Sequence, residues 1–479
     1  MRRRAVPRDG AAPVKASQSA EVDVWAPVTT EPEFGGVIGT AFLTVMIVLV
    51  VLLVTHKDWL SFPFLDGKLP DLLVDPVAYV RRAATPVGFG LPVAWWVMHA
   101  VLHIILPAEQ VLGAELATGH RLPYRINGFS CVVASLAIAA AWHVCAINSW
   151  YDLTPGVSLH WLAEPGSVEQ LAFGTLVLCV IKSTWLYAAS FQGRRLLAAP
   201  GNSGSPSYDW FMGRELNPRV RLPLGLGVID LKFFNELRPG MSAWLVLALA
   251  PVLKHLDATG ALQAAAEGRV ADGVRPEILA VAAMQLVYVL DSVLFERAIL
   301  TTIDIIMDGF GFMLCAGDLA WVPFTFSLQT RFMVQAGTPL PAWQWAAALA
   351  VGTAGYLVFR LSNLQKDQFK RDMDAPAVAG LATIPPRDEP PRANGGRLLA
   401  GGWWAASRHI NYLGDWLLGL SWCLLTGFQH PVPYLYAAYF AVLLVHRERR
   451  DDHKCAAKYG EHWAAYCRAV PCHIVPGLY

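Results

Sequence analysis

Charged residues are scarce in this sequence. Asp, Glu, Lys and Arg make up only 16% of its 479 residues, whereas about 25% is usual for a soluble domain. Hydrophobic residues make up 55%, and the mean hydropathy is +0.39. The formal net charge of +1 provides no strong overall field that would attract nucleic acid. We therefore expect a membrane protein with no nucleic-acid partner.

Several common motifs are also absent. The eight cysteines include no C-x-x-C pair and lie mostly in apolar runs, so we expect buried, reduced thiols. Zinc-type ligand spacing is missing, and no metal site is predicted. No G-x-G-x-x-G follows a strand and no Walker loop is present, so any nucleotide is bound without a Rossmann unit. No small-residue cleavage site precedes the first apolar run, which predicts an uncleaved first helix.

Long apolar runs recur along the whole chain. Each is long enough to cross, or nearly cross, a bilayer as a helix. The sequence therefore predicts an all-α, polytopic membrane protein with about ten transmembrane helices. We place them at about 37–55, 86–107, 129–147, 168–191, 240–256, 277–295, 309–329, 341–361, 412–427 and 433–446.

The distribution of Lys and Arg predicts the topology. Basic residues concentrate in the N-terminal tail, in the loops after the fourth and eighth spans and in the C-terminal tail, whereas 148–167 has none. Because basic loops stay in the cytoplasm, both termini are predicted to be cytosolic. We expect a basic cytosolic tail at 1–30, a membrane domain at 31–361 and a C-terminal cofactor-binding region at 362–479. The membrane is either a bacterial inner membrane or the endoplasmic reticulum.

Two polar clusters bracket the last apolar hairpin. The first is GGWWAASRHINYLGD at 401–415, and the second is HRERRDDHKCAAKY at 446–459. Such polar density beside an apolar segment is costly unless a ligand binds there, so we predict that the clusters line one cytosolic site. Lys366 and Lys370, one helical turn apart, would hold a phosphate group. The alternatives are a basic helix that contacts anionic lipid and ordinary positive-inside anchoring.

Polar residues within or beside the predicted spans are candidates for catalysis. Tyr288 and Asp291 are one helical turn apart, and Asp304 and Asp308 precede the seventh predicted span. Ionisable groups at such depth usually mark function, and an acid surrounded by aromatic residues could donate a proton. A structural pair with satisfied charges is the alternative for each of them.

The motifs together resemble those of a known family. The matching segments are EFGG at 33–36, DLKFFNELRPG at 230–240, TTIDIIMDGFGFMLCAGDLAWVPFTFSLQ at 301–329, NLQKDQFKR at 363–371, RHINYLGD at 408–415, HRERRDDHKCAAKYG at 446–460 and VPCHIVPGLY at 470–479. They resemble the sterol reductases, which include the Δ14- and Δ7-enzymes, the fungal side-chain enzyme and the lamin B receptor. The resemblance begins at about residue 31 and is strongest to the C14 branch.

This resemblance implies a ten-helix enzyme that uses NADPH to reduce a ring double bond of a sterol from the bilayer. Tyr288 matches a tyrosine of the inner sterol pocket, and we predict that it donates the proton, with Asp291, Asp304 or Asp308 behind it. No obligate protein partner is implied. The predicted cofactor-binding residues are Lys366, Lys370, Leu399, Trp404, Arg408, Asn411, Tyr412, Asp415, Arg447, Asp451, Cys455 and Tyr459.

The sequence departs from the family pattern at three positions. Ile410 stands where the family usually has proline, Met307 where it usually has histidine, and Lys370 where arginine is commoner. The lysine keeps the positive charge but cannot form the bidentate hydrogen bonds of an arginine. Three alternatives stay open. They are a Δ7-sterol reductase, an integral-membrane methyltransferase that uses S-adenosylmethionine, and a non-catalytic sterol-binding scaffold.

Overall fold

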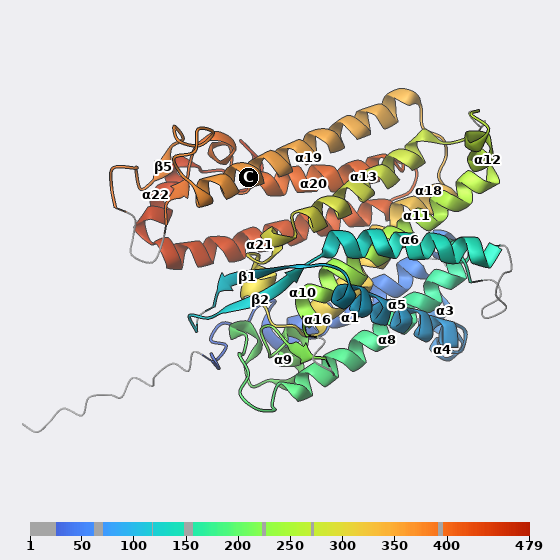
Figure 1. Cartoon of the computed structure of the whole chain (residues 1–479), viewed down its shortest axis with the longest axis horizontal. Helices are drawn as coiled ribbons and strands as arrows, with labels where there is room; N and C mark the ends of the chain where they lie inside the picture. Colours follow the sequence, from blue (N-terminus) through green and yellow to red (C-terminus); the bar gives the residue numbers. More distant parts are fainter. Residues whose placement is uncertain are drawn as a thin grey trace, which may run out of the picture.

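Helices form most of the molecule. The structure, a computed structural model, describes residues 25–61, 70–116, 118–147, 157–222, 227–269, 273–390 and 396–479. Most of the long helices run side by side along the longest axis of the molecule (Figure 1). The all-α prediction is therefore confirmed, whereas most of the predicted basic tail lies outside the described residues.

Seven helices in the described part of the chain are long and apolar enough to cross a membrane. Each overlaps a predicted span, but the fifth begins before its predicted start and the eighth continues past its predicted end. They are α1 (Gly36–Thr55), α5 (Pro86–Ile105), α6 (Gly128–Ile147), α8 (Pro165–Ala189), the run Leu231–Ala258 made of α10 (Leu231–Asn235), η4 (Glu236–Gly240) and α11 (Met241–Ala258), then α13 (Pro276–Leu294) and α19 (Ala342–Arg371).

The other three predicted spans are not single long apolar helices, so a count of about ten is not confirmed. The seventh predicted span is divided among α16 (Phe312–Ala316), the π-turn η5 (Gly317–Trp321) and α17 (Val322–Phe326), and α18 (Leu328–Gln335) follows. Helix α20 (Ile410–Leu424) has 15 residues and is about 22 Å long, shorter than the roughly 30 Å hydrocarbon core. Helix α21 (Leu435–Tyr459) is long, but its second half is charged.

Short elements connect the long helices. Three antiparallel strand pairs are present in the described residues: β1 (Glu109–Glu115) with β2 (Arg121–Ile126), β3 (Arg219–Arg221) with β4 (Val228–Asp230), and β5 (Thr383–Ile384) with β6 (Leu398–Leu399). The short helices are η1 (Trp59–Ser61), α3 (Asp71–Val74), α4 (Pro76–Ala83), α7 (Leu159–Leu162), η2 (Ala199–Gly201), α9 (Pro206–Met212), α12 (Ala261–Ala266), α14 (Glu296–Ile299), α15 (Ile303–Ile306), η6 (Gly402–Ala405), η7 (Val432–Tyr434) and α22 (Glu461–Ala469).

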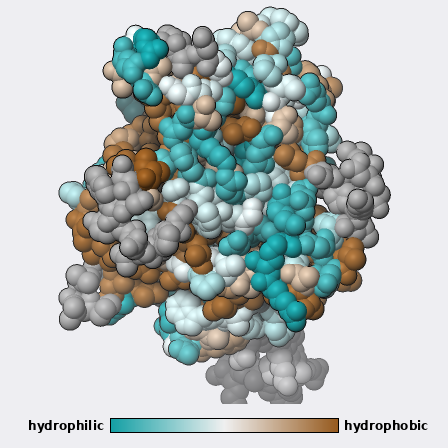
Figure 2. Space-filling view, turned by 90° about the vertical axis from the view of Figure 1, so that its right-hand side faces the viewer, coloured by the Kyte–Doolittle hydropathy of each residue, from teal (hydrophilic) through white to brown (hydrophobic). Residues whose placement is uncertain are grey.

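The surface is that of an integral membrane protein. On the end of the bundle shown in Figure 2, hydrophilic residues cover the centre and hydrophobic residues gather along the flanks. Helix α1 leaves large apolar side chains exposed, including Ile38 and Phe42. Exposed apolar surface of this extent marks a face that contacts lipid or a partner, and on spanning helices lipid is the contact.

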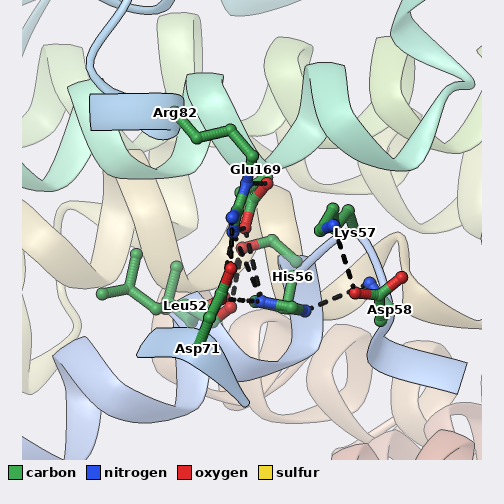
Figure 3. A network of polar contacts seen from close by, with 9 residues as sticks. Leu52, His56, Lys57, Asp58, Asp71, Arg82 and Glu169 are labelled. Carbon is green, nitrogen blue, oxygen red and sulfur yellow. Dashed lines mark hydrogen bonds and ion pairs between the residues drawn. The ribbon is translucent and has the colours of Figure 1, made fainter. Parts of the chain in front are cut away.

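A polar network ties α1 to three other helices (Figure 3). Arg82 of α4 donates to the buried Glu169 of α8 at 2.9 Å and to Asp71 of α3 at 3.1 Å. His56, which follows α1, contacts the Asp71 carboxylate at 2.7 Å. The hydrogen bonds from Arg82 hold the pKa of Asp71 well below its usual range. The network therefore fixes the end of α1 by charge as well as by packing.

Candidate cofactor and catalytic site

Two glycines bring the end of α19 beside the start of α20. A Cβ atom at Gly414 would lie 2.4 Å from the backbone nitrogen of Phe359, and one at Gly355 would lie 2.7 Å from the carbonyl oxygen of Gly414. Only residues without a side chain permit this approach between two helix backbones. The first polar cluster is consequently held against the polar end of α19.

Lys366 and Trp404 meet at this junction. Gly402 has a left-handed φ of +62°, and the Gln365 side chain occupies the place where its Cβ would project. The resulting turn, η6, buries Trp404, whose Nε1 donates to the carbonyl oxygen of Ser362 at 3.0 Å. The Lys366 ammonium lies 3.8 Å from the centroid of the Trp404 ring, within the range of a cation–π contact.

Two buried oxygen atoms at the start of α20 have no protein partner. The Asn411 amide nitrogen donates to Asn363 at 3.3 Å, but Asn411 Oδ1 and Asp415 Oδ1 accept no hydrogen bond from any described residue. An unpaired buried polar atom costs about 1–3 kcal/mol. These acceptors therefore favour a ligand with N–H or O–H donors.

Tyr288 lies in an aromatic chamber with an acid beside it. Its ring centroid is 5.4 Å from that of Trp244 on α11 and 5.5 Å from that of Trp422 on α20. The neighbouring acid is Asp415, whose carboxyl group interacts with the Tyr288 hydroxyl. Thus Asp415, predicted as a cofactor residue, links Tyr288 to the first polar cluster.

The two other predicted acids after α13 pair with arginines of α21. Asp304 forms an ion pair with Arg447, and Asp308 accepts from Arg450 at 2.6 Å. The ammonium group of the buried Lys232 donates to the backbone carbonyls of Asp304 and Asp308 at 2.6 and 2.7 Å. The segment that carries both acids is therefore fixed against the second polar cluster.

A third set of side chains connects the two polar clusters directly. His409 stacks on Tyr412 with ring centroids 4.7 Å apart, and its Nε2 lies 3.8 Å from Asp451 of α21. Cys455 lies 3.8 Å from the same carboxylate. Burial lowers the pKa of His409 to about 3 and raises the pKa of Cys455 to about 12. The imidazole and the thiol are therefore uncharged at neutral pH.

Arg408 lies behind this contact and packs against the C-terminal segment. It donates to Nε2 of His473 at 2.8 Å, and Nδ1 of His473 in turn contacts Glu448 of α21 at 2.5 Å. The backbone N–H groups of Arg408 and His409 also donate to the carbonyls of Cys472 and His473. Arg408 therefore supports the two clusters by linking them to the C-terminal segment.

Most of the predicted residues come together, and a few lie apart. Leu399 packs in one cluster with Trp404, and Tyr459 packs with Cys455 in the adjoining one. Asp291 points towards α19, where Tyr356 donates to it at 3.0 Å and Arg360 forms an ion pair with it. Its predicted place behind Tyr288 stays a prediction, and so does the phosphate-binding role of Lys370.

Sequence reasoning missed several residues of this site. Lys232 and Glu33 lie inside quoted motifs, but neither was predicted to pair. Glu33 receives a hydrogen bond of 2.9 Å from Arg450, which joins the segment before α1 to α21. A buried lysine in an apolar helix requires several acceptors, and that signal could have singled out Lys232.

A large cavity lies away from these residues. Its volume is about 890 Å³, and it is lined mainly by apolar residues of α5, α6, α8 and α11. Lys182 and Trp185 are among its lining residues, but none of the predicted catalytic or cofactor residues is. The predicted site is therefore a polar junction rather than this apolar cavity.

Comparison with known proteins identifies the family. The model of the ergosterol biosynthesis ERG4/ERG24 family matches residues 65–479. The chain belongs to this family. Relatives of this ERG4/ERG24 member include the mouse Delta(14)-sterol reductase TM7SF2, which is 38% identical over 452 residues, 93% of this chain and 97% of the relative.

Fungal and bacterial relatives match over similar lengths. The Delta(14)-sterol reductase ERG24 of Saccharomyces cerevisiae is 35% identical, over 95% of this chain and 99% of the relative. The Delta(14)-sterol reductase of Methylotuvimicrobium alcaliphilum is 36% identical, over 92% of this chain and 95% of the relative. The family membership predicted from the motifs is therefore confirmed across nearly the full chain.

Proposed function

We propose that this membrane protein is a Δ14-sterol reductase that uses NADPH and takes its sterol from the bilayer. The observation that carries the proposal is the pairing of Tyr288, enclosed by aromatic rings, with Asp415 of the first polar cluster. The names of the three relatives reported above, each a Delta(14)-sterol reductase, support the choice of double bond.

The residues present fit a dinucleotide. Lys366, held over Trp404, and the nearby Lys370 supply positive charge for phosphate groups. The unpaired oxygens of Asn411 and Asp415 would accept hydrogen bonds from an amide N–H such as that of a carboxamide. When bound, NADPH supplies the hydride that completes the reduction. These contacts support a cofactor site within residues 362–479, the predicted C-terminal region.

The chain's own residues supply the proton. An unactivated ring alkene accepts hydride poorly until one of its carbons is protonated. The Tyr288 hydroxyl would give its proton to one alkene carbon, which forms a C–H bond and leaves the neighbouring carbon cationic. The phenolate is then reprotonated through Asp415, whose carboxyl group adjoins the hydroxyl. The rings of Trp244 and Trp422 exclude water from the cation.

The decisive experiment identifies both the substrate and the cofactor. Protein purified in detergent is incubated with an equimolar mixture of Δ14, Δ7 and Δ24 sterols and with NADPH, and the sterols are then separated by gas chromatography and mass spectrometry. We expect the Δ14 sterol to be consumed and its product to be two hydrogens heavier. Parallel reactions with NADH or with S-adenosylmethionine test the other cofactors.

Each alternative gives a different result. Loss of the Δ7 sterol alone would replace the proposal by the Δ7 activity. A methylated product that depends on S-adenosylmethionine would indicate a methyltransferase. Sterol binding without turnover, by protein that still binds NADPH, would favour a scaffold.

A further inference from the structure

Three potential metal ligands meet at the end of the bundle remote from the cofactor site. His143 lies near the C-terminal end of α6, His160 in α7 and Asp257 in the last turn of α11. One ligand atom from each lies within 4.8 Å of the other two. The sequence predicted no metal site because these residues are far apart in the chain and form no recognisable spacing.

The burial of His143 and its unpaired ring nitrogen point to a ligand. Its side chain is only 6% exposed, and its Nδ1 atom is buried with no hydrogen-bond partner among the described residues. Its ring faces His160 at a centroid distance of 4.6 Å and an interplanar angle of 68°. Leaving such a nitrogen unpaired costs about 1–3 kcal/mol, and a metal ion would satisfy it.

The other two ligands are close together and reachable from solvent. His160 Nε2 lies 2.6 Å from Asp257 Oδ2, but the pair lacks the alignment of a hydrogen bond. Their side chains are 32% and 33% exposed. A metal ion could therefore reach the cluster from solvent and bind between imidazole and carboxylate.

The elements that carry the ligands are held in place. The Ser158 side chain caps α7 by accepting from the backbone nitrogen of Trp161 at 3.3 Å. Trp142, next to His143, donates from Nε1 to the carbonyl oxygen of Val157 at 2.9 Å. Helix α7 also packs along α11. Ligands on fixed elements lose little freedom when a metal binds.

We propose that His143, His160 and Asp257 bind a divalent transition-metal ion of the zinc class, which ties together α6, α7 and α11. Two imidazoles and one carboxylate form a donor set of the kind that zinc accepts, with water at the fourth tetrahedral position. Calcium and magnesium prefer oxygen ligands only and would not use the two histidines. Because zinc ligands lie about 2.0–2.2 Å from the ion, the exposed side chains of His160 and Asp257 rotate slightly to close the site.

The test measures zinc binding without reference to catalysis. Full-length protein is purified in detergent through a tag that contains no histidine, treated with a chelator and dialysed against Zn²⁺. Metal per chain is then measured by mass spectrometry. We expect one Zn²⁺ per chain in the wild type and an affinity at least about tenfold weaker in His143→Gln, His160→Gln and Asp257→Asn. His255→Gln, a change of another histidine near the end of α11, is the matched control and should bind as the wild type does.

A second measurement keeps the proposal falsifiable if a variant folds poorly. Added Zn²⁺ should raise the thermal unfolding temperature of the wild-type protein and of the His255→Gln control, because a ligand that binds only the folded state stabilises it. Co²⁺ in place of Zn²⁺ should give the visible absorption of a four-coordinate ion. The proposal is overturned if the wild type binds no Zn²⁺ at micromolar concentration, or if His143→Gln binds it as tightly as His255→Gln does.

Discussion

Replacing Tyr288 by Phe removes one hydroxyl group and leaves the chamber intact. The ring keeps its contacts with Trp244 and Trp422, whose centroids lie 5.4 and 5.5 Å away, so the packing changes little. The lost group is the proposed proton donor, which interacts with Asp415. A positioned general acid contributes about 10²–10⁴-fold to rate, or about 3–5 kcal/mol of barrier at roughly 1.36 kcal/mol per tenfold.

The assay separates turnover from binding. Sterol product is measured over time at saturating NADPH, and NADPH affinity is measured separately by titration. We expect kcat to fall by about 10²–10⁴-fold in Tyr288→Phe, with NADPH affinity and the unfolding temperature nearly unchanged. A kcat within threefold of the wild type would remove Tyr288 from the acid role.

Three further predictions concern stability. Arg238→Met should lower the free energy of unfolding in detergent by about 3–5 kcal/mol, because it leaves the buried Glu296 carboxylate without its ion-pair partner; a loss below about 1 kcal/mol would contradict this. Gly414→Ala should cost about 1–3 kcal/mol through overpacking, whereas Gly380→Ala, where a Cβ meets nothing within 4 Å, should be neutral. Because the folded-state pKa of Asp71 is depressed, its contribution to stability is complete above about pH 4 and is lost as the pH falls further. Asp71→Asn should weaken that acid dependence, and unchanged acid melting curves would refute the pairing.

Hydropathy was enough to predict seven of the helices but not the shape of the others. A window of apolar residues does not reveal that η5 is a π-turn or that Pro323 lies in the first turn of the next short helix. Both features depend on how the chain packs, because neighbouring helices satisfy the backbone groups that such breaks release.

The polar clusters could be located from the sequence, but several of their partners could not. The helical spacing of Tyr288 and Asp291 places them on nearby faces of α13, yet each meets a different neighbour. Tyr288 faces Asp415 of α20, whereas Asp291 faces Arg360 of α19. Spacing within one helix gives the face of a side chain but not the helix that packs against that face.

NADPH affinity tests the central claim most directly, because the claim is that both polar clusters and the end of α19 form one cofactor site. Titrations compare the wild type with one change in each part: Lys366→Met, Asn411→Leu and Arg447→Met. Lys254→Met is the control, since this partly exposed lysine pairs with Glu164 at the opposite end of the bundle. We expect each of the three changes to weaken NADPH binding at least about tenfold, or about 1.4 kcal/mol, and the control to leave it unchanged. If any one of the three variants folds and still binds NADPH as tightly as the wild type, the claim of a single shared site is contradicted.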